Sequence, residues 1–199
     1  MKWFSPGDVA RVAVFAALIA VLGLPGTLNL FGGAVPITLQ TFGVMLAGLI
    51  LGSWRAALAV AVLMALVATG LPLLAGGRGG LVAFTQPSAG FLIGWLPGAF
   101  VTGWIAERGG PGGRSPSVPR LLVACLVGGM GVVYLFGIPL LAVFGGLSLG
   151  AAAWSTLIFV PGDLAKSALA AWVARGTQRA YPAAIPAAHA KRPRPVEED

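Results

Sequence analysis

Long uncharged apolar segments constrain this chain more than any other feature of its sequence. Residues Leu121–Phe144 contain no charged side chain, and several other segments approach the roughly 20 apolar residues that span a bilayer as a helix. Hydrophobic residues make up 57% of the chain and charged residues only 10%, whereas soluble domains carry roughly 25% charged residues. Because so few polar side chains cannot cover a water-exposed surface, we expect lipid to surround this fold.

The apolar segments predict helices rather than a β-barrel. Barrel strands would appear as segments of about ten residues with alternating polarity, and the segments here are continuously apolar. The predicted fold class is therefore an all-α integral membrane protein with six transmembrane helices and with both termini in the cytoplasm. The expected spans are Val9–Leu24, Ile37–Gly52, Ala56–Leu74, Ser88–Ala106, Leu121–Phe144 and Pro161–Ala174.

Two segments depart from this regular pattern. The fifth span contains Gly137–Pro139, and we expect it to kink or end early there because proline removes a backbone donor. The apolar segment Gly145–Val160 is separated from the last span by Pro161–Asp163, and we interpret it as a short helix or a re-entrant segment. Residues 1–178 are predicted to form a single membrane domain, and the Pro/Ala-rich tail, 179–199, is predicted to be disordered.

The basic residues indicate the orientation of the chain. With the N-terminus in the cytoplasm, all 13 lysine and arginine residues fall on the inner side except Arg78, in an outer loop, and Lys166, in the last span. Cytoplasmic loops of membrane proteins carry such an excess of positive charge. The formal net charge of +7 is therefore a consequence of topology, and we expect no binding of nucleic acid.

Several chemistries lack the residues that they need. The only cysteine, Cys125, lies in an apolar segment, and the only histidine, His189, lies in the tail. We therefore expect neither a disulfide within the chain nor a histidine-based metal site. The sequence contains no GxxxxGK[ST] nucleotide loop, so the chain does not by itself use ATP in the usual way. The expectation is a protein with no metal, no cofactor and no enzymatic activity.

The most informative polar residues are Asp163 and Lys166 in the last span. Asp163 alone could serve as a helix cap, because the helix dipole favours an acid in the first turn. An ammonium one turn into a membrane helix costs about 2.5–3.5 kcal/mol, so Lys166 needs another explanation. At a spacing of i, i+3 the two residues can form an internal ion pair, or they can mark a substrate or ion path. Such a pair suits a ligand with N–H groups beside a carbonyl, or a ligand with its own carboxylate.

Two loops on the predicted outer face add polar groups. Thr38 and Gln40 begin the second span, Arg78 lies within a glycine run that allows close backbone approach, and Gln86–Phe91 opens the fourth span. Taken singly, each is ordinary loop or helix-start chemistry. Together with the pair in the last span, they predict a ligand cavity. The predicted binding residues are Thr38, Gln40, Arg78, Gly79, Gly80, Gln86, Ser88, Gly90, Phe91, Asp163 and Lys166.

The first span carries a stripe of small residues. Ala13 and Ala17 are four residues apart, as are Ala16 and Ala20, and such spacing favours close packing of membrane helices. The stripe packs either within this chain or against a partner membrane protein.

Four motifs, taken in their order along the chain, are informative: Pro36–Phe42, Gly70–Pro72 with Ala75–Gly80, Pro87–Gly94, and Pro161–Lys166. In this order they resemble the BioY family, the biotin-specific S-components of energy-coupling factor transporters, and the resemblance covers residues 9–178. It implies a six-helix fold with a vitamin pocket near the outer face, closed by the first and third loops, in which Asp163 and Lys166 contact biotin. It also implies that the alanine stripe docks on a transmembrane coupling protein driven by two ATPase subunits, in a prokaryotic cell membrane.

The sequence departs from the family pattern at one of these motifs. The family usually reads Gly-Pro-Thr-Gly-Gly-Tyr where this chain has Gln86–Phe91. Ser88 keeps the hydroxyl group, but Phe91 lacks the phenol, so no hydrogen bond to a ligand can come from that position. Gln86 is a candidate to supply one instead, and Arg78 could attract the carboxylate of biotin by charge alone.

The favoured hypothesis is a biotin-binding subunit of an uptake transporter. An S-component or small carrier for a different vitamin would share the fold and differ in the pocket. A membrane enzyme using Asp163 and Lys166 as acid and base would need further catalytic groups near the pair. An ion pathway built on Asp163 would need further intramembrane carboxylates, which the sequence lacks.

Overall fold

The structure, a computed structural model, describes residues 5–24, 38–108 and 116–180. Every regular element in these ranges is helical, and the only β-type pairing is an isolated bridge between Leu74 and Arg78. The helices are α1 (Pro6–Val21), α2 (Gln40–Leu51), α3 (Ser53–Ala68), η2 (Leu81–Phe84), α4 (Ala89–Glu107), α5 (Val118–Ala124), η3 (Cys125–Val132), α6 (Val133–Gly145), α7 (Leu149–Thr156), η4 (Leu157–Phe159) and α8 (Val160–Ala180).

Apart from the short 3-10 helix η2, the helices of the described ranges form six stretches, because α5, η3 and α6 are continuous, as are α7, η4 and α8. The stretches Ala89–Glu107, Val118–Gly145 and Leu149–Ala180 are long and apolar enough to cross a membrane, and Gln40–Leu51 and Ser53–Ala68 are shorter apolar helices. The prediction of an all-α fold with six helices is therefore confirmed. The third span is shorter than expected, since α3 ends at Ala68 and the chain to Leu74 is loop.

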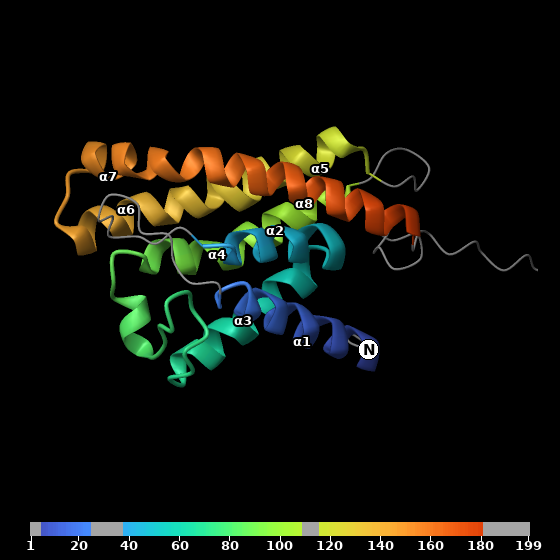
Figure 1. Ribbon diagram of the computed structural model, residues 1–199, viewed down its shortest axis with the longest axis horizontal. Helices are drawn as coiled ribbons and strands as arrows, with labels where there is room; N and C mark the ends of the chain where they lie inside the picture. Colours follow the sequence, from blue (N-terminus) through green and yellow to red (C-terminus); the bar gives the residue numbers. More distant parts are fainter. Residues whose placement is uncertain (1–4, 25–37, 109–115, 181–199) are drawn as a thin grey trace, which may run out of the picture.

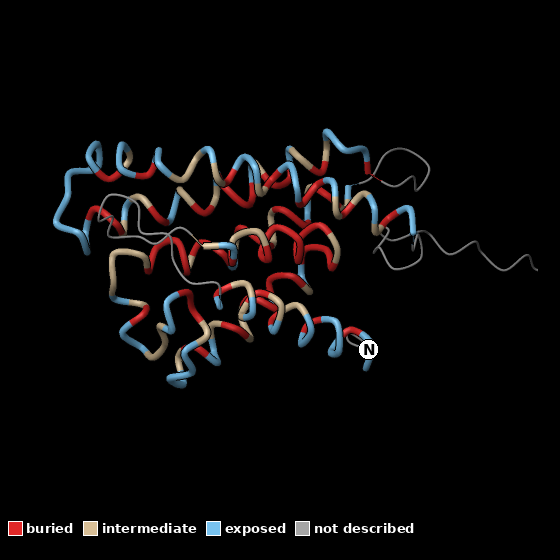
Figure 2. Tube along the Cα trace, in the orientation of Figure 1, coloured by how far each residue is buried: buried red, intermediate tan, exposed pale blue. Residues whose placement is uncertain are grey.

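Helix α4 lies at the centre of the bundle. It packs against α2, α3, α5, η3 and α6, while α1 packs on α2 and α3, and α8 packs on α2, α5 and η3. Figure 1 shows the resulting layers, with α7 and α8 along one side, α1 and α3 along the other, and α2 and α4 between them. Figure 2 shows the same pattern as burial, since the buried positions concentrate in the middle layer.

Small residues allow α4 to occupy this crowded position. A Cβ atom at Gly94 would lie 3.0 Å from the Val133 carbonyl oxygen, and one at Gly98 would lie 2.8 Å from the Gly128 carbonyl oxygen. Gly90, Gly94 and Gly98 are spaced four residues apart, which places them along one side of the helix. Close contact of this kind lets membrane helices gain dispersion energy in a solvent as apolar as their side chains.

The segment before α8 corrects one interpretation from the sequence. Residues 149–156 form α7, which continues through η4 directly into α8, so Leu149–Ala180 is one helical stretch of 32 residues. Of the two interpretations of Gly145–Val160, the structure therefore shows the short helix, and this helix forms the first part of the sixth stretch rather than a separate segment. The turn at Gly146, in the left-handed conformation with φ +64°, and the cap at Ser148 separate this stretch from α6.

The fifth stretch also differs in detail. Helix α6 continues through Pro139 to Gly145, so it does not end early at the proline. The irregularity lies upstream, where Cys125–Val132 forms a π-helix containing three glycines, Gly128, Gly129 and Gly131. A Cβ atom at Gly129 would meet the Met45 side chain at 2.6 Å, so close packing against α2 accompanies this stretch.

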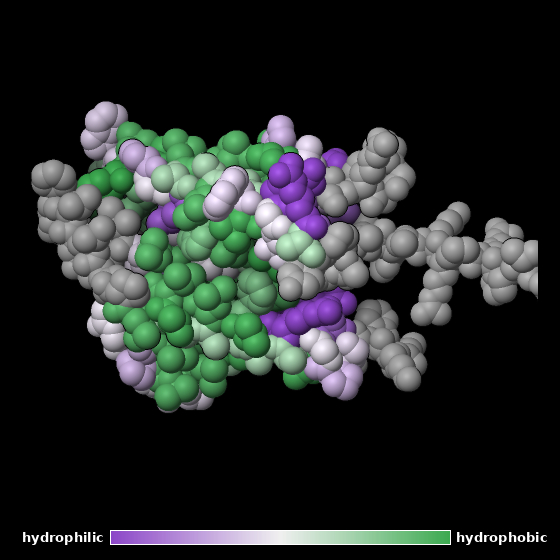
Figure 3. Space-filling model, turned by 45° about the vertical axis from the view of Figure 1, so that its right-hand side comes forward, coloured by the Kyte–Doolittle hydropathy of each residue, from purple (hydrophilic) through white to green (hydrophobic). Residues whose placement is uncertain are grey.

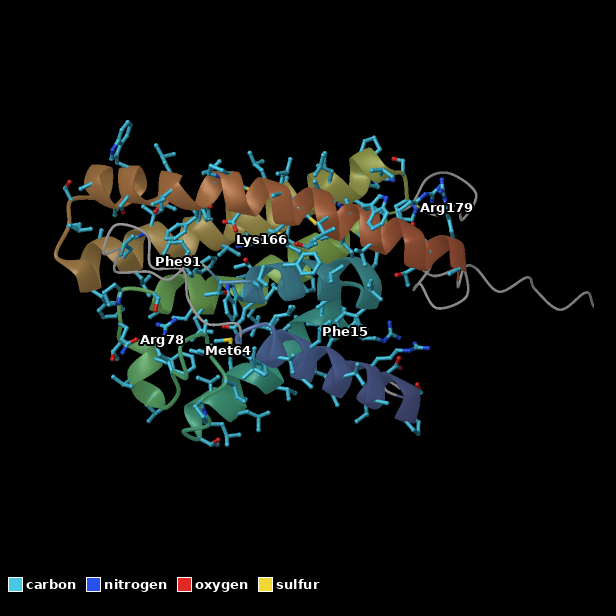
Figure 4. The ribbon with its side chains drawn as sticks, in the orientation of Figure 1. Phe15, Met64, Arg78, Phe91, Lys166 and Arg179 are labelled. Carbon is cyan, nitrogen blue, oxygen red and sulfur yellow. The ribbon has the colours of Figure 1, made fainter. Side chains whose placement is uncertain are left out.

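Charged residues are distributed unevenly along the long axis of the bundle. The start of α1 and the end of α8 lie at the same end, with Arg179 there and Arg78 at the opposite end (Figures 1 and 4). Apolar side chains cover most of the face in Figure 3, and strongly hydrophilic ones gather mainly toward the end at which α1 begins and α8 ends. This agrees with termini on one side of the membrane, as the basic residues predict. Helix α8 extends to Ala180, two residues into the predicted tail, and residues 181–199 lie outside the described ranges.

Candidate functional site: a polar cavity between α2, α4, α6 and α8

An ion pair in the first turns of α8 forms the centre of the site. Lys166 Nζ lies 3.0 Å from Asp163 Oδ1, and the two side chains are only 12% and 8% exposed. The i, i+3 spacing in a helix brings the two groups to one face, as expected from the sequence. Two buried charges so placed partly neutralise each other, which makes their position within an apolar bundle tolerable.

Side chains from two other helices complete a network around this pair. The Tyr134 hydroxyl, from α6, donates to Asp163 Oδ2 at 2.6 Å, and Lys166 Nζ donates to Thr41 Oγ1, from α2, at 3.1 Å. The Ser167 hydroxyl donates to the Asp163 backbone carbonyl at 2.7 Å. Three helices therefore hold the carboxylate and the ammonium in a defined geometry. Figure 4 shows Lys166 directed into the bundle beside Phe91.

A cavity of about 630 Å³, counting the space at its open mouth, adjoins this network. Its lining combines polar side chains from α2, α6, α8 and the loop before α4 with apolar side chains mainly from α4. The polar lining residues are Thr38, Gln40, Thr41, Arg78, Ser88, Tyr134, Asp163 and Lys166. The apolar ones are Leu74, Phe91, Leu92, Trp95, Val133 and Phe159.

Aromatic rings form one wall of the cavity. The Phe91 ring meets the Tyr134 and Phe159 rings edge-on, with centroid separations of 6.2 and 6.0 Å. Such T-shaped contacts favour a fixed arrangement of the rings. Gly137 makes room for this wall, because a Cβ atom there would lie 2.7 Å from the far end of the Phe91 ring.

Gln40 holds the outer loop in place rather than facing the cavity with a free amide. Its Nε2 donates to the carbonyls of Ile19 and Leu73, at 3.2 and 3.0 Å, and its Oε1 accepts from the Ala75 N–H at 2.9 Å. The residue is 1% exposed. Gln40 therefore ties α1 and the loop after α3 to the start of α2, and its predicted role becomes that of a positioning residue.

Arg78 spans the loop at the mouth of the cavity. Its Nε donates to the Ala75 carbonyl at 3.1 Å, and one terminal nitrogen donates to Ser88 Oγ at 2.8 Å and to Gln86 Oε1 at 3.3 Å. Burial lowers the pKa of the Arg78 guanidinium below its usual value, because desolvation disfavours the charged form. An anionic group at the mouth of the cavity would offset this desolvation.

The structure brings seven of the predicted binding residues to the cavity and leaves four away from it. Thr38, Gln40, Arg78, Ser88, Phe91, Asp163 and Lys166 line it, whereas Gly79, Gly80, Gln86 and Gly90 do not. Gly90 lies against α6, where a Cβ atom would meet Leu140 Cβ at 2.7 Å, and Gly79 lies against the Leu71 backbone. Gly80 shapes the loop through a φ of +79°, and Gln86 is hydrogen-bonded to Arg78. The first loop, residues 25–37, lies outside the described ranges.

Seven lining residues were absent from the prediction: Thr41, Leu74, Leu92, Trp95, Val133, Tyr134 and Phe159. Tyr134 carries the only hydroxyl group in the apolar stretch Leu121–Phe144, a signal that could have identified it. Thr41 follows Gln40 directly, so the polar residues at the start of the second span, which identified Gln40, could have identified Thr41 as well. Trp95 and Phe159 look like ordinary apolar residues in sequence, and only the packing of the helices brings them to the cavity.

The alanine stripe on α1 divides between two environments. Ala16 is 4% exposed and packs inside the bundle, and Ala20 is half-buried. Ala13 and Ala17 are exposed. Ala13 and Ala17 are therefore the members of the stripe that a partner helix can reach.

The described residues contain no group of three or more His, Cys, Asp or Glu side chains that could hold a metal ion. The lining of the cavity offers hydrogen-bonding groups, charge and aromatic surface. These are the means by which a small polar molecule is recognised.

Comparison with known proteins identifies the family. The model of the BioY family matches residues 1–183. The chain belongs to the BioY family. It is 46% identical over 180 residues to the biotin transporter BioY of Rhizobium etli, covering 89% of this chain and 96% of that protein. It is 47% identical over 187 residues to the biotin transporter BioY of Rhodobacter capsulatus, covering 89% of this chain and 96% of the relative.

A solved structure matches the fold as well. The crystal structure of the S-component for biotin from an ECF-type ABC transporter superposes with a TM-score of 0.82 at 31% identity, covering 87% of this chain and 91% of that one. This BioY family member is thus a multi-pass membrane protein with the S-component fold. The resemblance inferred from the four sequence motifs is confirmed.

Proposed function

We propose that this BioY family member is the biotin-binding subunit of a vitamin uptake transporter. The observation that carries the proposal is the buried Asp163–Lys166 pair, which lines a cavity between four helices. Relatives that match almost the whole chain at 46–47% identity are biotin transporters. Buried ionisable groups in a membrane protein mark a substrate site by default, and the biotin transporters in the family indicate which substrate binds there.

The remaining hydrogen-bonding capacity of the pair matches the chemistry of biotin. A carboxylate offers about four acceptor positions and an ammonium three donors. Asp163 uses two acceptor positions, toward Tyr134 and Lys166, and Lys166 uses two donors, toward Asp163 and Thr41. Asp163 therefore keeps acceptor positions and Lys166 keeps one donor, and these lie side by side. The ureido ring of biotin carries N–H groups next to a carbonyl, and its tail ends in a carboxylate, so both kinds of group find a complement.

The chain acts as a carrier, and the energy for transport comes from other subunits. The sequence contains no nucleotide-binding loop of the GxxxxGK[ST] type. The structurally similar S-component belongs to an ECF-type ABC transporter. We infer a membrane-embedded coupling protein and two ATPase subunits as partners, with the exposed Ala13 and Ala17 on α1 as part of the contact surface.

Isothermal titration of biotin into the detergent-purified protein tests the proposal, with thiamine and riboflavin as control ligands. Saturable binding of one biotin per protein, without binding of either control, is the expected result. A folded sample that binds no biotin would refute the substrate assignment. Binding of a control vitamin instead would direct attention to Gln86–Phe91, where the sequence departs from the family pattern.

A further inference from the structure

Trp95 differs from the polar residues around the cavity. It is 6% exposed and lines the cavity, and its indole Nε1 has no hydrogen-bond acceptor within the described residues. Gln40, Arg78, Tyr134 and Lys166 all have partners there. Buried polar groups in native proteins are nearly always paired, so a buried donor without a partner at a ligand cavity calls for an acceptor from outside the protein.

The backbone at Trp95 is firmly held. Trp95 follows Phe91 by one turn of α4, about 6 Å farther along the helix. Gly94, directly before Trp95, and Gly98, on the next turn, pack closely against Val133 and Gly128, where added Cβ atoms would meet carbonyl oxygens at 3.0 and 2.8 Å. The donor therefore belongs to a rigid element, and a ligand must come to it.

The surroundings of Trp95 indicate which kind of acceptor fits. Trp95 belongs to a buried apolar cluster with Leu92 and Val133, and both of these residues also line the cavity. A carboxylate among such side chains would lose its hydration for a single neutral donor, which is unfavourable. The cations that a carboxylate requires, Lys166 and Arg78, stand on other elements of the lining. A neutral carbonyl oxygen is the acceptor that this corner of the cavity suits.

We propose that Trp95 determines ligand specificity by donating an indole N–H hydrogen bond to the neutral ring carbonyl of the bound ligand. This inference rests on the proposed function, in which that carbonyl belongs to the ureido ring of biotin. A site built to hydrogen-bond a particular group rejects analogues that lack it, because the protein donor is then left unpaired. Trp95 thus selects for a cyclic urea within an otherwise apolar corner.

The test combines a variant without the donor with two analogues of biotin. Trp95→Phe keeps an aromatic ring but removes the N–H. 2-Iminobiotin lacks the ring carbonyl oxygen, and biotinamide lacks the tail carboxylate. Titration calorimetry gives the dissociation constants of the three ligands for the wild type and the variant. Trp172→Phe, at a position on α8 that is 73% exposed, is the matched control for loss of a tryptophan.

We expect Trp95→Phe to weaken biotin binding about tenfold, because the variant loses one net hydrogen bond and part of the aromatic contact. The preference for biotin over 2-iminobiotin should fall by a similar factor, and the preference for biotin over biotinamide should stay unchanged. Trp172→Phe should behave like the wild type. This pattern would place the Trp95 donor at the ring carbonyl, by the logic of a double-mutant cycle.

Two outcomes would overturn the inference while leaving the proposed function standing. An unchanged preference for biotin over 2-iminobiotin would show that Trp95 does not bind the carbonyl, and a changed preference over biotinamide would place it at the carboxylate. Failure of the wild type to bind biotin would instead refute the proposed function. If Trp95→Phe does not fold, benzothienylalanine at position 95 removes the N–H while keeping the size of the ring system, and the same comparisons decide.

Discussion

Removal of the Lys166 ammonium should weaken ligand binding far more than a change at an exposed position of α8. The substitution Lys166→Met deletes the charge and retains most of the aliphatic stem, so packing is largely kept. Two of the three ammonium protons point to Asp163 and Thr41, at 3.0 and 3.1 Å, and the third remains for a ligand. A hydrogen bond from a charged group contributes about 1.5–3 kcal/mol, which corresponds to roughly a 10- to 150-fold loss of affinity.

The same substitution should also lower stability, and a second change should restore it. Removing one partner of a buried ion pair costs about 3–5 kcal/mol when both charges are fully buried. The cost here should lie below that range, because Asp163 borders the cavity and keeps its hydrogen bond from Tyr134. Asp163→Asn combined with Lys166→Met removes both charges, so we expect the melting temperature to recover while biotin binding stays weak.

Calorimetry with biotin and thermal melting in the same detergent measure the two effects separately. Arg179→Met, which removes a positive charge from an exposed position on the same helix, is the matched control and should change neither quantity. Wild-type affinity in Lys166→Met would refute the placement of the ligand at the ion pair. Recovery of binding in the double variant would show that charge balance, rather than the geometry of donor and acceptor, governs the site.

Three further substitutions probe other parts of the structure. Tyr134→Phe removes the 2.6 Å hydrogen bond that orients the site carboxylate, and calorimetry should show biotin affinity reduced about tenfold with folding retained. Gln40→Met leaves the Ile19 carbonyl on α1, and the Leu73 carbonyl and Ala75 N–H in the loop after α3, without this partner, at about 1–3 kcal/mol each. The melting temperature should therefore drop sharply even without ligand, and an unchanged value would refute the positioning role. Ala17→Leu should spare biotin binding but reduce co-purification with the coupling protein, whereas Ala16→Leu, at a position 4% exposed, should destabilise the isolated subunit.

The helical architecture was predictable because the constraint of lipid acts on each segment separately. A backbone in hydrocarbon must satisfy its own hydrogen bonds, so apolar length alone indicates where helices lie. The ion pair was predictable for a similar reason, since the spacing of Asp163 and Lys166 places them on one face of any α-helix. The join between α7 and α8 was missed, because Pro161 occupies a position in the first turn of α8, where a proline can follow a preceding helical turn without a break.

Contacts between helices were not predictable from local patterns. Tyr134 meets Asp163 across a separation of 29 residues, and Lys166 meets Thr41 across 125. These meetings depend on how each helix is rotated, and the π-helix at Cys125–Val132 alters that rotation just before Tyr134 by widening the helical turn. The role of Gln40 was hidden for the same reason, because its three partners lie on α1 and on the loop after α3.

The donors left over in the cavity explain how so apolar a chain can still be selective. Among the described residues, Lys166 and Trp95 each keep one N–H without an acceptor, the Thr41 hydroxyl accepts from Lys166, and Asp163 keeps acceptor positions beside them. A ligand must therefore bring a carbonyl or carboxylate to several donors and N–H groups to one carboxylate. Thiamine would bring a quaternary cation toward Lys166 and leave those donors unpaired in a region of low dielectric. Unpaired buried groups cost more than a paired group gains, so the cavity discriminates chiefly by penalising ligands that lack the correct acceptors.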